Sequence, residues 1–360
     1  MLPLLCIGTP LVEVHAEVSS SVLDKYFLQR NAVVQAEERH KPLLRQLLGD
    51  GASAAKVDLL PGGGAAAAAL VASRLAHADE RPVAAIDKQS LFYIGGVGRD
   101  ELGRTFAELC RKEGIQALLS ETDVEATGWR AVLRTKPESA AIPGLGLPPG
   151  EDVDFMRRGP MAMVVFTGAG HDYKLDHLRF KVWESVEAAK IIYIEALFLT
   201  ISPESVRIVA EHCAKAGKIF VMNLSARYIC SFFRDKIFTM LPYIDYLIGN
   251  ESEYFELAEN QKEMEACKTI DDIISWLARQ PRADGDAKRK RYVIATCGNL
   301  PTLVAATWKG FGVKVTRYPV PVVPAWHLHC KDGAGDAFTG GILFSLMLQA
   351  NLDSCIHMAL

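Results

Sequence analysis

Short apolar runs alternate with amphipathic stretches along most of this chain. The runs rich in branched and aromatic residues predict β-strands at Leu4–Ile7, Phe92–Val97, Lys190–Ile194, Lys218–Met222, Tyr246–Ile248 and Tyr292–Thr296. The stretches between and after them predict helices at Ala65–Leu75, Leu102–Lys112, Ser202–Ala216, Arg227–Met240, Ser252–Gln261, Thr269–Arg279 and Ala337–Leu348. This alternation is typical of crossover units, which build a mostly parallel sheet with helices on both faces.

Two regions break the alternation. Residues from about Leu11 to Leu59 and from about Ala117 to Pro160 mix short β-like stretches, such as Gly128–Arg134, with polar and Pro/Gly-rich sequence. The densest Pro/Gly segment is Gly144–Gly150, which we expect to be a mobile insertion.

The most informative motif is Gly333-Ala334-Gly335-Asp336, directly before the apolar helix. Small residues at a helix N-terminus leave backbone N–H groups bare, and the helix dipole favours negative charge there. A carboxylate in the first turn can take a proton from a hydroxyl while the N–H groups stabilise a phosphoryl group. The alternative is an Asp N-cap behind a flexible turn.

A second motif, Asn250-Glu251-Ser252-Glu253, follows a predicted strand. Asn250 and Glu253 are one helical turn apart and can share one face, where they could hold a hydrated magnesium ion through water. A capping box at a helix start explains the same spacing, and both interpretations can hold together. Asn250 and Gly298 each fall just past a strand end, where parallel sheets bind ligands.

These motifs together resemble those of the ribokinase-type (PfkB) carbohydrate and nucleoside kinases. Gly333–Phe338 resembles the family's C-terminal signature, Asn250–Glu253 its Asn-x-x-Glu motif, and Thr296–Gly298 its Thr-x-Gly segment. Further stretches are similar to the adenosine kinases within that family: Leu23–Tyr26, Ala36–Lys41, Phe198–Ser205 and Met222–Ala226. The resemblance runs from about Ile7 to Leu360.

The resemblance implies a ribokinase-like, three-layer α/β fold, with a mostly parallel central sheet flanked by helices and a small β-rich lid. Residues 1–10, 60–116 and 161–360 would form the large nucleotide-binding domain, and residues 11–59 and 117–160 the lid. The family continues with a further helix and strand beyond the helix that begins near Ser354, so a truncated C-terminus is expected.

The resemblance also implies a function, which is ATP-dependent phosphorylation of the 5'-hydroxyl of adenosine to AMP, with Mg2+, as in purine salvage. Asp336 would be the general base, and Gly333, Ala334 and Gly335 the anion hole. The residues implied to bind ATP or phosphate are Asn223, Asn250, Glu253, Thr296 and Gly298, with Glu253 holding magnesium through water. Those implied to bind the acceptor are Glu13, Gly62, Gly63, Ala67 and Phe198; a core role for Phe198 is the alternative.

The acceptor motifs depart from the family. Glu13 stands where adenosine kinases carry an Asp that grips the ribose hydroxyls, and Ala67 where they carry an Asn. Cys330-Lys331-Asp332 replaces Asp-Thr-Asn, and His171 replaces a common Asn. Three interpretations stay open: an adenosine kinase with a divergent pocket, a kinase for another nucleoside or sugar, and a member that no longer catalyses.

Composition is compatible with an enzyme and narrows the partners. At 360 residues, 49% hydrophobic and 23% charged, the chain can bury a large core. A net charge of −3 gives no footprint for nucleic acid, and the basic run Lys288–Arg291 is expected to be a solvated loop. The eight cysteines lack Cys-x-x-Cys spacing, and no apolar stretch is long enough to span a bilayer, so we expect a cytoplasmic protein without zinc, disulfides or membrane contact. A monomer is also expected.

Overall fold

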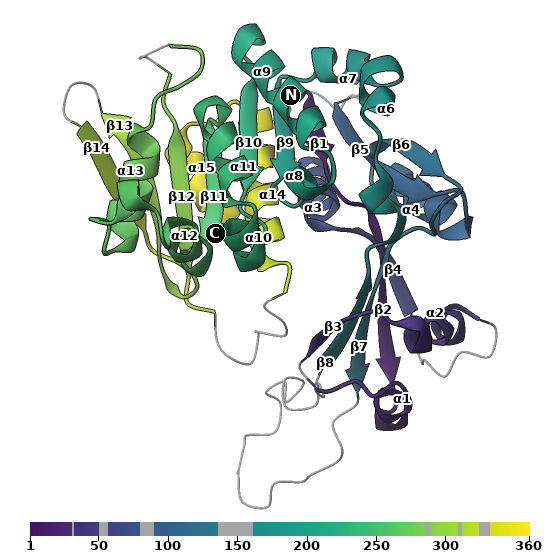
Figure 1. Ribbon diagram of the computed structural model, residues 1–360. Helices are drawn as coiled ribbons and strands as arrows, with labels where there is room; N and C mark the ends of the chain where they lie inside the picture. Colours follow the sequence, from purple (N-terminus) through teal and green to yellow (C-terminus); the bar gives the residue numbers. More distant parts are fainter. Residues whose placement is uncertain are drawn as a thin grey trace, which may run out of the picture.

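The computed structural model describes residues 1–30, 32–49, 57–79, 90–135, 161–285, 289–308, 312–323 and 332–360. In these ranges a nine-stranded sheet forms the body of the molecule (Figure 1). Its strands run in the order β14 (Gly312–Tyr318), β13 (Leu300–Trp308), β12 (Tyr292–Cys297), β11 (Tyr246–Asn250), β10 (Ile219–Asn223), β9 (Ile191–Glu195), β1 (Leu4–Ile7), β5 (Leu91–Gly98) and β6 (Gln116–Thr122). The seven strands from β12 to β6 are parallel, and β13 and β14 extend the sheet antiparallel.

Alternate residues of the central strands enter two separate cores. On β1, Leu4 and Cys6 belong to one hydrophobic cluster and Leu5 and Ile7 to the other. Because successive side chains of a strand point to opposite faces, both faces of the sheet must be covered. The three-layer α/β architecture expected from the sequence is therefore confirmed.

The helices divide between these two faces (Figure 1). One core includes residues of α3 (Gly64–Ala78), α4 (Glu101–Lys112), α14 (Ala334–Met347) and α15 (Leu352–Ala359). The other includes α6 (Leu175–Phe180), α7 (Trp183–Ala188), α8 (Phe198–Ile201), α9 (Pro203–Ala216), α10 (Arg227–Phe232), α11 (Arg234–Met240), α12 (Glu251–Ala258) and α13 (Ile270–Arg279). Four 3-10 turns complete the body and the small unit: Glu38–His40, Gly168–Asp172, Leu241–Tyr243 and Lys262–Met264.

A second, five-stranded sheet projects from the body beside β1 and β5 (Figure 1). It runs in the order β3 (Val33–Gln35), β8 (Met161–Phe166), β7 (Trp129–Thr135), β2 (Leu11–Val18) and β4 (Val57–Gly62). Two short helices, α1 (Ser20–Lys25) and α2 (Lys41–Leu48), belong to this unit. The expected insertion at Gly144–Gly150 lies outside the described residues.

The expected domain boundaries shift by a few residues. β4 pairs with β2 from Ala16 opposite Val57 to Leu11 opposite Gly62, so the small unit reaches Gly62. In contrast, β6 pairs with β5 in the large sheet, and β8 returns to the small sheet beside β7. Strand pairing within each of the two sheets, which is not visible locally, sets these boundaries.

Two local predictions need correction. The helix predicted at Arg227–Met240 is two helices, because the backbone leaves the helical region at Phe233 (φ −120°, ψ 21°). In the basic run before β12, Lys288 lies outside the described residues, and Arg291 is not solvated, since it is 1% exposed and donates to the carbonyl groups of Leu241, Ile244, Leu277, Gln280 and Pro281. Within the described ranges, no helix combines the length and apolar character needed to cross a bilayer.

Candidate active site

The N-terminus of α14 faces open space. Gly333 adopts the left-handed conformation (φ 76°, ψ −3°) directly before the helix, which a side chain would disfavour. A Cβ placed on Gly333 or Gly335 would meet no other atom within 4 Å. Because the first N–H groups of a helix have no partner inside it, this open end can receive an anion.

The carboxyl ends of four parallel strands lie beside this helix end. In register, Glu195 on β9 pairs with Asn223 on β10, and Asn250 on β11 pairs with Thr296 on β12. A small cavity of about 70 Å³ opens at this edge. It is lined by Asn223, Ser225, Ile248, Gly249, Asn250, Glu253, Thr296, Gly335, Asp336, Phe338 and Thr339.

Asn250 and Glu253 form a reciprocal capping box at the start of α12. The Asn250 N–H donates to Glu253 Oε2 at 2.9 Å, and the Glu253 N–H donates to Asn250 Oδ1 at 3.0 Å. Burial raises the pKa of Glu253 above its ordinary value. The capping interpretation is confirmed, and both residues still line the small cavity.

Asn223 is held mainly by neighbouring protein groups. Its Oδ1 accepts the Ala196 N–H at 3.3 Å and the Ser225 hydroxyl at 2.8 Å. The Ser225 hydroxyl in turn accepts the Leu197 N–H at 3.1 Å. Asn223 thus fixes the chain that leaves β9, at the wall of the small cavity.

A larger cavity of about 290 Å³ lies on the side of the small sheet. It is lined by Thr9, Leu11, Val33, Val34, Gln35, Gly63, Gly64, Arg130, Val165, Thr167, Glu195, Leu197 and Tyr228. Since its walls come from both sheets and from the start of α3, it is the candidate acceptor cavity. The glycines Gly63 and Gly64 lie in its wall, where the lack of a side chain lets the backbone come close to a ligand.

Glu195 is a buried carboxylate at the end of β9, with 2% of its surface exposed. Its Oε1 accepts the Thr9 N–H at 2.5 Å and its Oε2 accepts the Ala65 N–H at 3.1 Å, so it joins the end of β1 to the first turn of α3. Burial raises the pKa of Glu195 to about 7, although these hydrogen bonds act against the shift.

Asp336 lies between the two cavities. It lines the small cavity directly, and a Cβ built on Gly64 of the acceptor cavity would lie 3.2 Å from Asp336 Oδ1 and 2.6 Å from Glu195 Oε2. Burial raises the pKa of Asp336 to about 7; the negative charge of Glu195 acts in the same direction, and Arg130 opposes both. A carboxyl group with such a pKa is suited to general base catalysis near neutral pH.

An ion-pair cluster connects the small sheet to the loop before α14. Arg130 on β7 pairs with Glu13 on β2 through Nη2 and with Asp332 through Nη1, at 3.1 Å from Asp332 Oδ2. His15 Nε2 lies 2.9 Å from the other Glu13 oxygen. Burial would raise the pKa of Glu13, but the hydrogen bond from His15 and the charge of Arg130 lower it overall.

Seven of the predicted site residues lie outside both cavity linings, namely Glu13, Gly62, Ala67, Phe198, Gly298, Gly333 and Ala334. Gly62 packs on the Glu13 stem, where an added Cβ would be 2.2 Å from Glu13 Cγ. Ala67 lies on the first turn of α3, and Gly298 in the turn between β12 and β13, where an added Cβ would meet nothing within 4 Å. Phe198 is 0% exposed and packs edge-on against Tyr173, at 5.2 Å between ring centroids, which favours its core role.

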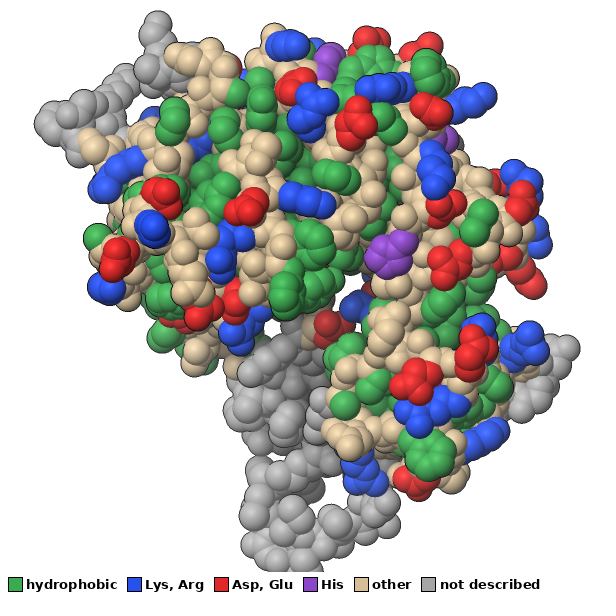
Figure 2. Space-filling view, in the orientation of Figure 1, with side chains coloured by type: hydrophobic (Ala, Val, Ile, Leu, Met, Phe, Trp, Pro, Cys, Tyr) green, Lys and Arg blue, Asp and Glu red, His purple; other side chains and the backbone are tan. Residues whose placement is uncertain are grey.

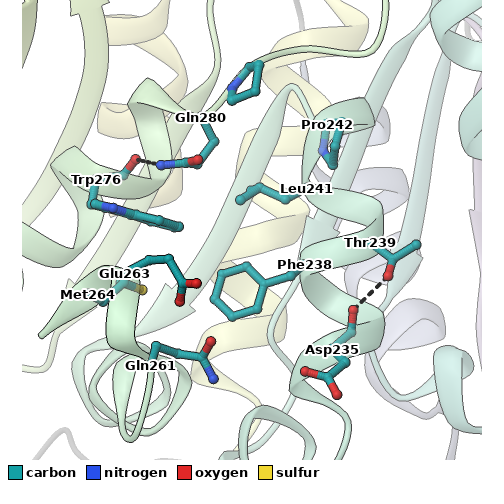
Figure 3. A pocket seen from close by; sticks show the side chains of 11 residues that line it. Asp235, Phe238, Thr239, Leu241, Pro242, Gln261, Glu263, Met264, Trp276 and Gln280 are labelled. Atoms are coloured by element: carbon teal, nitrogen blue, oxygen red, sulfur yellow. Dashed lines mark hydrogen bonds between the residues drawn. The ribbon is translucent and has the colours of Figure 1, made fainter.

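A third cavity, of about 490 Å³, shares no lining residue with the two cavities beside Glu195 and Asp336 (Figure 3). It lies between α11 and α13 and is lined by Phe238, Leu241, Met264 and Trp276 together with Asp235, Thr239, Pro242, Gln261, Glu263, Gln280 and Pro281. It contains none of the motif residues. Figure 2 shows acidic and basic side chains mixed over one face of the body, without a patch of a single sign.

Sequence reasoning missed Glu195 and Arg130. Glu195 ends a buried strand, so the rule that selected Asn250 could have selected it. Arg130 had no comparable signal, because its position within β7 does not reveal that Glu13 and Asp332 approach it from distant segments.

The comparisons with known proteins agree with this geometry. Residues 156–360 match the pfkB family of carbohydrate kinases. The chain is 31% identical to adenosine kinase 1 of Arabidopsis thaliana over 98% of its own length and 90% of that protein. It belongs to the pfkB family.

Solved structures extend the likeness of this pfkB family member to the fold. An adenosine kinase of Anopheles gambiae, solved with P1,P4-di(adenosine-5) tetraphosphate, is 28% identical with a TM-score of 0.73, covering 99% of this chain and 92% of that one. The adenosine kinase of Trypanosoma brucei brucei is 24% identical with a TM-score of 0.79, over 99% and 96% of the two chains, and supports the fold. The ribokinase-like fold expected from the sequence is confirmed.

Proposed function

We propose that this protein transfers the γ-phosphoryl group of ATP to the 5'-hydroxyl of adenosine, giving AMP and ADP. The observation that carries the proposal is the position of Asp336, between the acceptor cavity and the open N-terminus of α14. The choice of adenosine is supported by the adenosine kinases to which the chain is similar over nearly its full length.

The residues divide the reaction between them. Asp336 accepts the proton of the acceptor hydroxyl as the oxygen attacks phosphorus, because its raised pKa makes it a competent base. The N–H groups of Gly333, Ala334 and Gly335 stabilise the charge on the transferring group, at the positive end of the α14 dipole. Asn223, Asn250 and Thr296 border the phosphates, with Gly298 as a further contact in the turn after β12.

Magnesium fits this site only through water. Among the described residues, no cluster of three or more His, Cys, Asp or Glu side chains is arranged to hold a metal. The small cavity offers the Glu253 carboxylate beside Asn250, which suits a magnesium ion that keeps most of its waters and also binds substrate phosphates. Glu253 would hold it through water, and the ion would neutralise charge on the β- and γ-phosphates.

On the acceptor side, Gly63 brings the backbone close to the sugar, and Glu13 packs against the neighbouring Gly62. Ala67 contributes no hydrogen bond of its own. We further propose that the protein is a monomer. We also propose that it works in a reducing cytosol, which is supported by the described cysteines: all of them are free, and five are buried.

Kinase activity toward another nucleoside or sugar is the second candidate. The Arg130–Glu13 pair favours it, because Glu13 already has a cation and His15 as partners, and a hydroxyl of the acceptor must compete with them. No observation in the described residues favours the third interpretation, a family member that no longer catalyses. Asp336 and the open N-terminus of α14 are both in place.

Calorimetric titration with adenosine and with ATP, each alone, tests the two halves of the site without requiring turnover. Chromatographic detection of AMP then tests the reaction, and ADP release scored over a panel of nucleosides and sugars compares acceptors. Binding of ATP without adenosine, together with turnover of another acceptor, would replace adenosine by that acceptor. Binding of neither substrate would refute the kinase proposal.

A further inference from the structure

Glu195 places a second carboxyl group beside the proposed base. Both carboxylates approach the backbone of Gly64, with Oε2 of Glu195 and Oδ1 of Asp336 at 2.6 and 3.2 Å from the place where a Cβ would be. A residue larger than glycine at this position would have to displace one of them. The two groups are therefore close enough to interact strongly in an interior where charges are poorly screened.

Glu195 is also held rigidly. Its two oxygens take N–H groups from Thr9 and Ala65, which belong to the turn after β1 and to the first turn of α3. Since each carboxylate oxygen can accept more than one hydrogen bond, Glu195 still has acceptor capacity toward the cavity that it lines.

We propose that Glu195 is a positioning residue of the phosphoryl-transfer site: it fixes the turn at Gly64 and forms a coupled carboxyl pair with Asp336. The inference rests on the proposed function, in which Asp336 is the base. In each turnover the acceptor O–H bond breaks as its oxygen bonds to the γ-phosphorus, the bond from that phosphorus to the bridging oxygen breaks, and ADP leaves. The proton passes to the carboxyl pair and then to solvent.

Several other titratable or charged groups face Asp336 and Glu195 and influence their pKa values. Arg130 and Glu13 from the small sheet and Asp332 from the loop before α14 act on Asp336, and Glu253 lies across the small cavity. The groups that face Glu195 are Cys6 on β1, Tyr93 on β5, Tyr193 on β9 and Tyr228 on α10. Burial raises the pKa of each of these thiol and phenol groups, so they stay neutral at pH 7 and leave the titration there to the carboxyl pair.

Carboxyl ¹³C NMR titration of the full chain labelled at Asp and Glu tests the pair without substrate. We expect two carboxyl groups with midpoints near neutral pH. In Glu195→Gln the Asp336 midpoint should fall by about one pH unit, a tenfold change in proton affinity, and in Asp336→Asn the Glu195 midpoint should fall as well, because the coupling free energy between two sites is reciprocal. Midpoints that do not move in either variant would overturn the pairing.

The pH profile of kcat/KM provides the second readout. Glu195→Gln should move the acid limb to lower pH, because the anionic neighbour that disfavours ionisation of Asp336 is gone, whereas Glu195→Asp keeps the charge and should leave the limb near its original place. Asp332→Asn is the graded control: its side chain is 36% exposed, so solvent screens it and the limb should move less. An unmoved limb in folded Glu195→Gln would refute the coupling. Failure of the native chain to bind adenosine would refute adenosine as the acceptor. The NMR titration, which uses no substrate, would still test the Glu195–Asp336 pair.

Discussion

The phosphoryl end of this site is formed mainly by main-chain groups, and the acceptor end mainly by charged side chains. At the phosphoryl end, a helix N-terminus, glycines and strand ends converge around Asp336. At the acceptor end, charged side chains from distant segments meet, with Arg130 between Glu13 and Asp332 and with Glu195 opposite. Backbone sites depend on the fold alone, so they persist while side-chain sites can change their ligand.

The largest effect should come from the phosphoryl end. Asp336→Asn keeps the shape of the side chain but cannot accept a proton, so we expect kcat to fall by about 10²–10⁴. ATP affinity, measured by calorimetry, should stay nearly unchanged. Turnover close to that of the native chain would remove Asp336 from the role of base and weaken the contrast between the two ends.

The same substitution should raise stability at high pH. The folded-state pKa of Asp336 is about 7, above its unfolded value, so ionisation of this group costs stability as pH rises through that range. The melting temperature of Asp336→Asn should therefore exceed that of the native chain at pH 8, and the difference should vanish near pH 4. Equal melting temperatures at pH 8 would contradict the shift.

A smaller effect should follow from breaking the ion-pair cluster at the acceptor end. Arg130→Met removes the guanidinium that pairs with Glu13 and Asp332, which should cost about 1–3 kcal/mol of stability, because Glu13 is buried whereas Asp332 is 36% exposed and partly screened by solvent. The charge of Arg130 lowers the pKa of Asp336, so its removal raises that pKa and activity should fall more at pH 7 than at pH 9.

Arg99→Met is the matched control for this change. Arg99 pairs with Glu121 and Asp123, and all three side chains are more than half exposed, so its removal should change stability by less than about 1 kcal/mol. Urea unfolding of both variants measures the difference. Equal costs would mean that the Arg130 cluster is an ordinary surface network.

A substitution at Phe198 tests whether its ring belongs to the hydrophobic core or to the acceptor site. Because its ring is fully buried against Tyr173, Phe198→Leu should lower stability by about 1–2 kcal/mol and leave adenosine affinity unchanged. Phe232→Leu, at a side chain that is 80% exposed, is the control and should change little. Weakened adenosine binding without loss of stability would instead support stacking on the base.

The sequence predicted the body of the fold well, because buried parallel strands and amphipathic helices leave a local signature. The strand Leu4–Ile7 is observed as predicted, and most helices differ by one to three residues at their ends. The antiparallel strands β13 and β14 were not predicted. β14 lies at the edge of the sheet, where polar residues interrupt the apolar pattern, whereas the buried run Leu303-Val304-Ala305 of β13 is an apolar signal that could have revealed it. The break at Phe233 arises from packing against the core, which periodicity does not report.

Only the phosphoryl end of the site has a signature in the sequence, because its motifs are local. Gly333–Asp336 and Asn250–Glu253 are local motifs whose geometry follows from a helix start, so their chemistry is visible in the sequence. Arg130 and its partner Glu13 are 117 residues apart in the sequence, and Glu195 and its partner Ala65 are 130 residues apart. Only the tertiary fold brings such groups together, and so the acceptor end was understood least.

The smallest expected effect tests whether the acceptor end still follows the adenosine pattern. In Glu13→Asp with Ala67→Asn, the shorter carboxylate withdraws from Arg130 and His15, while the amide adds a donor on the first turn of α3. Each new hydrogen bond to a ribose hydroxyl should contribute about 0.5–1.5 kcal/mol, so adenosine should bind several-fold more tightly.

ATP affinity serves as the internal control for this double variant, because neither residue lines the small cavity on the phosphoryl side. Calorimetry with adenosine and with ATP on both proteins makes the comparison. If the double variant binds adenosine no better, and the native chain turns over a different acceptor, then Arg130 and Glu195 have remodelled the acceptor end for that molecule, while the backbone-built phosphoryl end has stayed the same.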